Sequence, residues 1–206
     1  MFKVVFPALV GVASYGVYYL VRSGIFHDFR IKTGRFATEE EFMLRTVKGP
    51  YSNVGLEFKK LLKLMDKMSG SPMNQPGSQV VGVYHDDPFL VAESDIRSSV
   101  GVALGSFSNP EEVRKYLQAE GYRSARIPSF ASLYCEYPFT GFISVMISIW
   151  KLYGFDQSKG GKLVKYLKEH PDVDQFAPYI AVTTSDTEIV YFPLEDIAKS
   201  FEKVLA

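Results

Sequence analysis

The sequence predicts an α+β fold, in which duplicated strand–helix–strand–strand units form a mainly antiparallel sheet with helices on one face, plus an N-terminal transmembrane helix. Three observations indicate this fold. Short strand-like segments alternate with amphipathic helical segments, one turn motif opens a helix at two places, and an uncharged apolar stretch lies near the N-terminus. The 206 residues suffice for one sizeable domain with an attached segment.

The duplication is indicated by a motif in which a proline, an aromatic residue and a hydroxyl residue precede a helix. The first copy is Gly49-Pro50-Tyr51-Ser52, and the second is Tyr137-Pro138-Phe139-Thr140. Proline is favoured where helices begin, and Ser, Thr or Asn can cap the first turn. We therefore expect an internal duplication of a strand–turn–helix unit.

The first unit is expected to hold one amphipathic helix and three strands. Apolar residues recur at helical spacing from Val54, with lysines on the other face. Gly, Pro and Ser residues indicate a loop over 69–78, and Asp and Pro residues indicate a turn over 85–88. The expected elements are strand 41–48, helix 54–67, loop 69–78, strand 79–84, turn 85–88 and strand 95–104.

A helix–strand insertion and the second unit follow. Asn109-Pro110 is typical of a helix start, and Gly121 of a helix end. The helix of the second unit, capped by Thr140, is more apolar than its counterpart. The expected strands are 122–127, 132–137, 178–183 and 188–192, with further helices over 162–170 and 194–205.

The stretch from Val4 to Val21 contains no charged residue and would span about 27 Å as a helix, enough for a bilayer core. A signal peptide and a buried soluble helix are the alternatives. The stretch is not followed by the small-residue cleavage site of a signal peptide, and it has no polar face of the kind that a soluble helix shows. Cations are more numerous after the stretch than before it, which places the following domain in the cytosol. We expect an anchor over 1–22, a juxtamembrane connector over 23–38 with a short strand near 29–32, and a domain over 39–206.

Composition excludes several function classes. Lys and Arg number 23, as do Asp and Glu, so no basic excess favours nucleic acid as a partner. The lone Cys135 is typical of a small buried residue, and the three histidines show no metal-ligand spacing. The pair Asp86-Asp87 reads as a turn. No metal and no cofactor is expected.

Several short motifs together resemble the GyrI-like small-molecule-binding domain family. They are Gly49-Pro50-Tyr51 before an amphipathic helix, the segment VGVYHDDP over 81–88, and Arg97-Ser98-Ser99-Val100-Gly101-Val102. The resemblance covers residues 42–194 and continues in Ser148-Ile149-Trp150 and Phe192-Pro193-Leu194. With its N-terminal anchor, the chain is most similar to the membrane-anchored ER-phagy receptors of that family. This implies a single-pass protein of the endoplasmic reticulum membrane whose domain faces the cytosol and whose partners include the autophagy machinery.

The resemblance also implies an aromatic-lined cleft between the repeats, which would hold a small hydrophobic or cationic ligand. Aromatic faces attract a cation, and a carboxylate neutralises it. Family members that bind cations or hydrolyse reactive compounds carry a Glu in a Glu-x-Tyr context on a late strand. Here Ile180 and Val182 stand at those positions, which favours a non-catalytic domain. The expected ligand-binding residues are Tyr51, Tyr84, Tyr134, Glu136, Phe139 and Trp150. Glu136 could supply the replacement carboxylate, or it could be an outward-facing strand residue.

Three functions stay open at this point. The leading one is a binding module for a small amphipathic ligand or a partner peptide. The second is an adaptor in turnover of the endoplasmic reticulum, which needs an aromatic-x-x-aliphatic motif that adds a strand to its partner. That pattern occurs at Tyr179-Ile180-Ala181-Val182 and Tyr191-Phe192-Pro193-Leu194, both within expected strands. The third is a hydrolase of electrophilic small molecules that would use Glu136.

Overall fold

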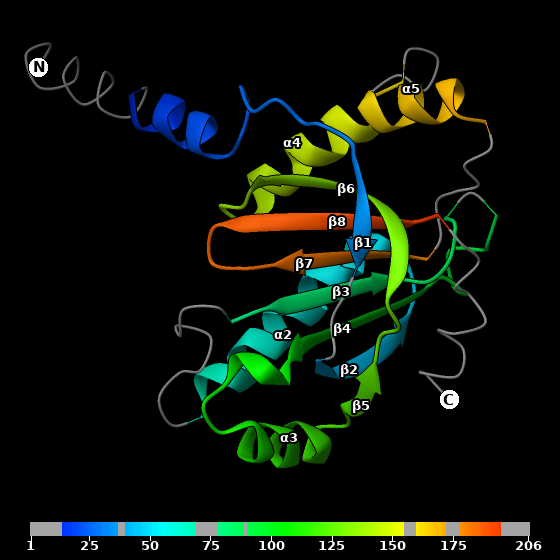
Figure 1. Cartoon of the computed structure of the whole chain (residues 1–206). Coiled ribbons are helices and arrows are strands. Elements are labelled where there is room, and N and C mark those ends of the chain that lie inside the picture. Colours follow the sequence, from blue (N-terminus) through cyan, green and yellow to red (C-terminus); the bar gives the residue numbers. More distant parts are fainter. Residues whose placement is uncertain are drawn as a thin grey trace, which may run out of the picture.

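The computed structural model describes residues 14–36, 40–68, 78–88, 90–154, 160–171 and 178–194. Over these residues one eight-stranded antiparallel sheet carries four helices, with a further helical segment at residues 14–22 (Figure 1). The strands are β1 (Lys32–Phe36), β2 (Glu41–Lys48), β3 (Val80–Tyr84), β4 (Arg97–Ala103), β5 (Arg123–Arg126), β6 (Phe130–Pro138), β7 (Tyr179–Thr183) and β8 (Thr187–Pro193). The helices are α2 (Val54–Asp66), α3 (Pro110–Ala119), α4 (Phe142–Tyr153) and α5 (Lys162–Glu169), with short 3-10 turns η1 (Tyr51–Asn53) and η3 (Leu104–Ser106).

The strand order β1-β6-β8-β7-β3-β4-β2-β5 shows the two predicted units as two halves of the sheet. The first unit is β2, α2, β3 and β4, and the second is β6, α4, β7 and β8. From the centre outward, β3, β4 and β2 match β7, β8 and β6. The halves meet where β3 and β7 pair with Gly82 opposite Ala181, so any site shared by the two units lies over these two strands.

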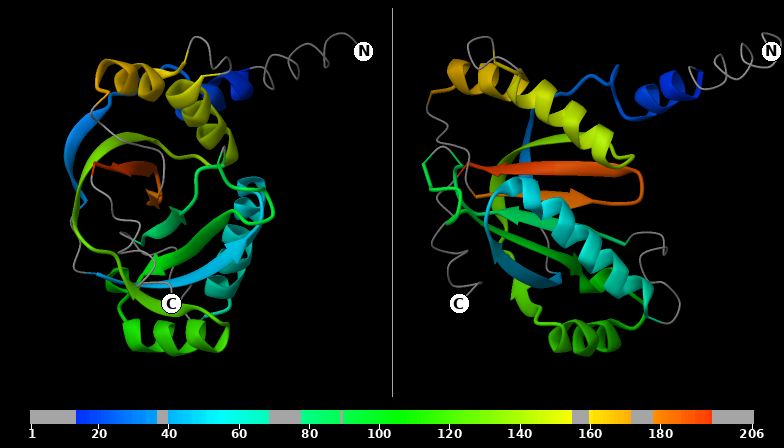
Figure 2. Two further views of the ribbon diagram at one scale, coloured as in Figure 1. Left: turned by 90° about the vertical axis from the view of Figure 1, so that its right-hand side faces the viewer. Right: turned by 180° about the vertical axis from the view of Figure 1, so that it is seen from behind.

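The sheet is strongly curved, and α2 and α4 lie on its outer side (Figure 2). This helix-covered face carries two hydrophobic clusters, one under α2 and α3 and the other under α4 and α5. The opposite face carries a third cluster that includes Phe42, Val81 and Ile180. The prediction of an antiparallel α+β sheet with helices on one face is confirmed for the described residues.

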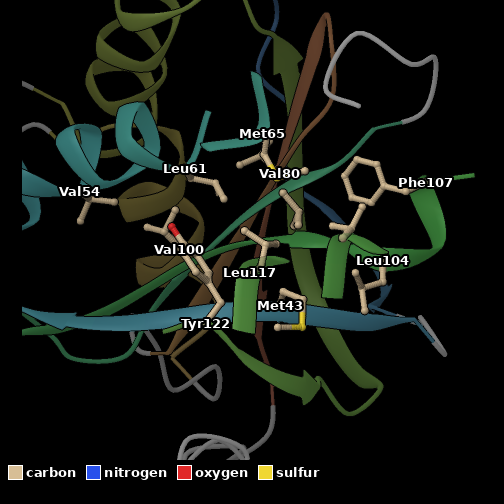
Figure 3. Packing of buried hydrophobic residues seen from close by; sticks show 12 residues of the cluster. Met43, Val54, Leu61, Met65, Val80, Val100, Leu104, Phe107, Leu117 and Tyr122 are labelled. Atoms are coloured by element: carbon tan, nitrogen blue, oxygen red, sulfur yellow. The ribbon is translucent and has the colours of Figure 1, made fainter. Parts of the chain in front are cut away.

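Helix α2 shows how the sequence pattern produces this packing. Val54, Leu61 and Met65 recur on one side of the helix and are buried, whereas its lysines are exposed. Leu61 and Met65 pack against Val100 of the sheet, and Leu117 of α3 closes the same cluster (Figure 3).

Residues 23–36 of the expected connector 23–38 contribute to the domain. Phe29 is buried, with its ring 5.3 Å from that of Tyr137, and β1 pairs with β6 along its whole length. The Nζ atom of Lys151 in α4 donates a hydrogen bond of 2.7 Å to the carbonyl of His27. The expected strand near 29–32 begins instead at Lys32, because Phe29 packs into the helix-covered core.

Two other predictions concern the chain ends. Residues 4–13 of the predicted anchor and residues 195–205 of the predicted closing helix lie outside the described residues. Among the residues that are described, none belongs to a helix with the length and apolar character needed to traverse a bilayer. The loop predicted at 69–78 also falls largely outside the described ranges.

The prediction that Thr140 caps α4 is wrong. The N-cap is Gly141, with φ at 105°, a conformation that favours glycine. The backbone N–H of Thr140 donates to Ser144 Oγ at 3.0 Å, and its hydroxyl lies 2.7 Å from Ser23 Oγ. The hydroxyl is therefore used to hold the N-terminal segment rather than the helix end.

Candidate functional site

Five tyrosines gather on the helix-covered face where the two repeats meet. We name this set the tyrosine cluster: Tyr51 of η1, Tyr84 of β3, Tyr137 of β6, Tyr153 of α4 and Tyr179 of β7. The ring centroids of Tyr84 and Tyr179 are 4.4 Å apart and stacked, and Tyr51 meets Tyr84 edge to face at 5.0 Å. Tyr84 packs against the clusters under both helices and therefore joins the two repeats.

One member of the tyrosine cluster binds a buried carboxylate, that of Glu188 in β8. Tyr137 lies across from Glu188 in the β6–β8 register, and its hydroxyl donates to Glu188 Oε1. Thr183 Oγ1 donates to Oε2 at 3.2 Å. Glu188 and Tyr137 are buried, whereas Tyr51, Tyr84, Tyr153 and Tyr179 are each partly exposed. The arrangement joins a group of partly exposed aromatic rings to a hydrogen-bonded acid through Tyr137.

Burial perturbs the acid–base behaviour of this group. It raises the pKa of Glu188, although the hydrogen bonds from Tyr137 and Thr183 oppose the rise. Burial also raises the pKa of Tyr84, and the negative charge of Glu188 adds to that rise. The tyrosines stay neutral donors at physiological pH. Among the described residues no cation contributes to the pKa of Glu188, and a cation placed among the rings would supply a positive charge.

Tyr51 is fixed by the turn that follows β3. Its hydroxyl donates to the carbonyl of Asp86 at 2.5 Å and accepts from the N–H of Asp86 at 3.1 Å. Arg97 holds Asp86 in turn, with Nη2 to Oδ1 at 2.7 Å and its backbone N–H to Oδ2 at 2.6 Å. Burial, opposed by the hydrogen bond to Asp86, raises the pKa of Tyr51 to about 12. The Asp86 turn is therefore structural, and it orients one ring of the cluster.

The six residues predicted from the sequence fall in different places. Tyr51 and Tyr84 lie together in the tyrosine cluster. Tyr134 and Glu136 lie on the opposite face of β6, where the Tyr134 ring is 5.8 Å from that of Tyr191. Side chains alternate between the faces of a strand, so Tyr137 faces the helices and its neighbour Glu136 does not.

Glu136 is an exposed carboxylate rather than a buried one. Half of its side chain is exposed, and Oε2 lies 3.9 Å from Nζ of Lys32, which also sits 5.7 Å from the centre of the Tyr134 ring. This position agrees with the outward-facing interpretation. An exposed pair of this kind contributes little to stability.

The two remaining predicted residues are Phe139, which follows β6, and Trp150, which belongs to α4. Phe139 is half-buried, and its backbone N–H donates to the carbonyl of Asp186 at 2.8 Å. Trp150 is 38% exposed in α4.

Sequence reasoning missed Glu188 and three tyrosines of the cluster, Tyr137, Tyr153 and Tyr179. The available signal was the alternation of β8, in which Glu188, Val190 and Phe192 share one phase and are all buried. A charged residue in the buried phase of a strand indicates a specific partner. Tyr137 could be identified as that partner only from the pairing of β6 with β8.

Two further predictions concern metals and motifs. Within the described ranges, no three or more His, Cys, Asp or Glu side chains are grouped to hold a metal ion. Cys135 packs in the cluster under α4, and burial raises the pKa of its thiol to about 11.

Both aromatic-x-x-aliphatic segments begin in strands that are paired on both sides. Strand β7 lies between β8 and β3, and β8 lies between β6 and β7. Their backbones are already engaged in the sheet.

Comparison with known proteins gave structural likeness only, since no protein-family model and no curated protein matches the sequence. The C-terminal domain of EcmrR is similar with a TM-score of 0.45 and 10% identity, over 80% of this chain and 96% of that domain. An integron cassette protein from Vibrio cholerae gives 0.43 and 9%, over 80% and 96%. A hydrolase from Listeria innocua gives 0.38 and 12%, over 82% and 94%.

Proposed function

We propose that this chain is a non-catalytic GyrI-like binding domain that holds a small amphipathic cation at the tyrosine cluster, and that residues 4–21 anchor it in the membrane of the endoplasmic reticulum with the domain facing the cytosol. One observation carries the ligand proposal: buried Glu188 accepts a hydrogen bond from Tyr137 of the tyrosine cluster, whose other four rings are partly exposed where the repeats meet.

The chemistry of the cluster favours a hydrophobic cation over other ligands. Tyrosine faces carry negative potential, and a desolvated cation above a ring is stabilised by roughly 2 kcal/mol or more. Glu188 adds a full negative charge once it is ionised. An anion would meet both the rings and the carboxylate with the wrong sign, so the site discriminates by charge.

The test compares two ions of nearly the same shape and opposite charge. Tetraphenylphosphonium and tetraphenylborate are titrated by calorimetry into the full chain in lipid nanodiscs, with empty nanodiscs subtracted. We expect saturable binding of the phosphonium alone. Equal binding of both ions, or of neither, would contradict the cation site and leave a partner peptide as the ligand class to examine.

Matched variants locate the binding. Glu188→Gln should weaken phosphonium binding at least tenfold, about 1.4 kcal/mol, because the buried charge is lost. Glu136→Gln, a carboxylate on the opposite face, should leave the affinity unchanged. Tyr84→Phe should keep most of the affinity and Tyr84→Ala should not, because the ring face rather than the hydroxyl makes the contact. If Glu136→Gln weakens phosphonium binding and Glu188→Gln does not, the ligand lies on the other face of the sheet.

A further inference from the structure

Helix α4 exposes an apolar stripe on its outer side. The stripe consists of Phe142, Met146, Ile149 and Trp150, which recur at helical spacing, with Phe142 77% exposed and the others 38–46% exposed. Its other side packs into the domain through Ser144, Ile147, Ser148 and Leu152. The helix is therefore apolar on both sides, although only one side contributes to the core.

The stripe carries no charge. Lys151 is the one charged residue of α4, and its Nζ donates to the carbonyls of Gly24 and His27 at 3.3 Å and 2.7 Å. Contiguous exposed apolar residues of this kind mark an interaction surface.

The stripe lies next to the end of the uncharged run from Val4 to Val21. In the helical segment at 14–22, Tyr19 Oη donates to the carbonyl of Thr140 at 2.8 Å, and Ser23 Oγ lies 2.7 Å from Thr140 Oγ1. Thr140 immediately precedes α4. Phe26, which is 82% exposed, lies just beyond these contacts. The N-terminal helical segment (dark blue) leaves the domain on the side where α4 begins (Figure 1).

We infer that the α4 stripe and Phe26 lie in the headgroup region of the bilayer that residues 4–21 enter, so that the domain rests on the membrane through α4. This inference rests on the proposed anchor. A segment that enters the bilayer from residue 21 fixes Thr140, and with it the first turn of α4, close to the membrane surface. Amphipathic helices bind there with Trp, Phe and Leu among the lipids.

The charges beside the stripe favour anionic lipid. Helix α5 packs against α4 and exposes Lys165 and Lys168, while its Lys162 forms an ion pair with Asp28. Lysines next to a membrane surface attract anionic headgroups by about 1 kcal/mol each. A second copy of this chain would instead place these lysines against one another.

Trp150 is the only tryptophan of the chain and reports directly on the stripe. The full chain is reconstituted in phosphatidylcholine vesicles containing phosphatidylserine, with bromine on the acyl chains either near the headgroup or near the bilayer centre. We expect Trp150 to lose most of its emission to the shallow bromines, less to the deep ones, and little to aqueous acrylamide.

Variants and flotation separate the outcomes. Phe142→Lys with Ile149→Lys should restore acrylamide access to Trp150, whereas Leu62→Lys, a similarly exposed position on α2, should not. A chain that floats with the vesicles while Trp150 is open to acrylamide contradicts docking and retains the anchor. Trp150 that is shielded from acrylamide yet unquenched by bromine means that protein covers the stripe, which also overturns the inference. A chain that neither floats nor shows bromine quenching overturns the anchor and the docking together.

Discussion

The two repeats share a backbone plan and differ in what their helices expose. Helix α2 presents Lys59, Lys60 and Lys63 to solvent, and its Glu57 forms ion pairs with Lys60 and with Arg45 of β2. Helix α4 presents Phe142 and Ile149 instead. Because α2 packs on the same face with a charged outer side, the fold does not require an apolar one. The apolar outer side of α4 therefore points to a role outside the core.

The turns between the last two strands of each repeat also differ. The first repeat buries a polar network after β3, in which His85 Nε2 lies 2.8 Å from Ser99 Oγ and Arg97 binds Asp86. The second repeat has a short turn at Thr184–Thr187 and places its buried charge one residue later, at Glu188. One turn holds a polar network, and the other is followed by an acid that binds Tyr137 of the tyrosine cluster. Four predictions test how the two repeats differ.

The largest effect is expected at Gly101 of β4, which lies opposite Leu44 where β4 pairs with β2 in the first repeat. A Cβ atom at this position would lie 1.8 Å from the carbonyl oxygen of Met43, a backbone atom that cannot move without distorting β2. Gly101→Ala should lower the free energy of unfolding by about 3 kcal/mol or more. Gly55→Ala in α2, where a Cβ meets nothing within 4 Å, should raise it by about 1 kcal/mol. Urea denaturation measures both, and an unaffected Gly101→Ala variant would refute the close packing of β2 and β4.

The next largest effect is the pH dependence contributed by His85. Burial and the positive charge of Arg97 lower the pKa of His85 from 6.5 to about 4, although the negative charge of Asp86 opposes this fall. The unfolded chain therefore takes up this proton first as pH falls, so stability is lost between pH 6.5 and 4, by about 3 kcal/mol in total. His85→Gln should remove this loss, whereas His170→Gln at an exposed position should keep it. The measurement is the urea denaturation midpoint of each variant at a series of pH values from 8 to 4. If the midpoints of the parent and of His85→Gln fall in parallel with pH, the buried neutral histidine is refuted.

A smaller effect of opposite sign is expected at Glu188. Because its folded-state pKa lies above the ordinary 4.5, the native state loses stability as pH rises from 4.5 through the raised value. Glu188→Gln keeps an acceptor for Tyr137 and removes the buried charge. It should be more stable than the parent at pH 8 by on the order of 1 kcal/mol, with the difference shrinking at pH 4. A variant less stable at pH 8 would mean that the charge already has a partner.

The smallest effects are expected on the outer sides of the helices. Ile149→Lys in α4 and Leu62→Lys in α2 should each change the free energy of unfolding by less than about 0.5 kcal/mol, because both side chains are largely exposed. The measurement is thermal unfolding in detergent, away from any bilayer. A large loss for Ile149→Lys alone would show that the α4 stripe contributes to folding.

The sequence predicted the local elements better than the site. Strand 41–48 matches β2, and Asn109-Pro110 and Gly121 bracket α3, because alternation and helix-end residues act over a few positions. Tyr134 and Glu136 were expected in the site, but both phases of β6 contain an aromatic residue, so alternation alone does not tell which phase faces the helices. Glu188 was missed because its burial depends on Tyr137, which lies 51 residues away in the chain.

The pKa of Glu188 tests the central claim most directly. The full chain carries glutamate labelled with ¹³C at the side-chain carboxyl carbon, and Glu188→Gln assigns the resonance. We expect a pKa above 4.5 in the free protein and a fall in that pKa when tetraphenylphosphonium saturates the site, because the cation stabilises the ionised carboxylate. A Glu188 pKa at or below 4.5 in the free protein, or one that the cation does not move, would contradict the account.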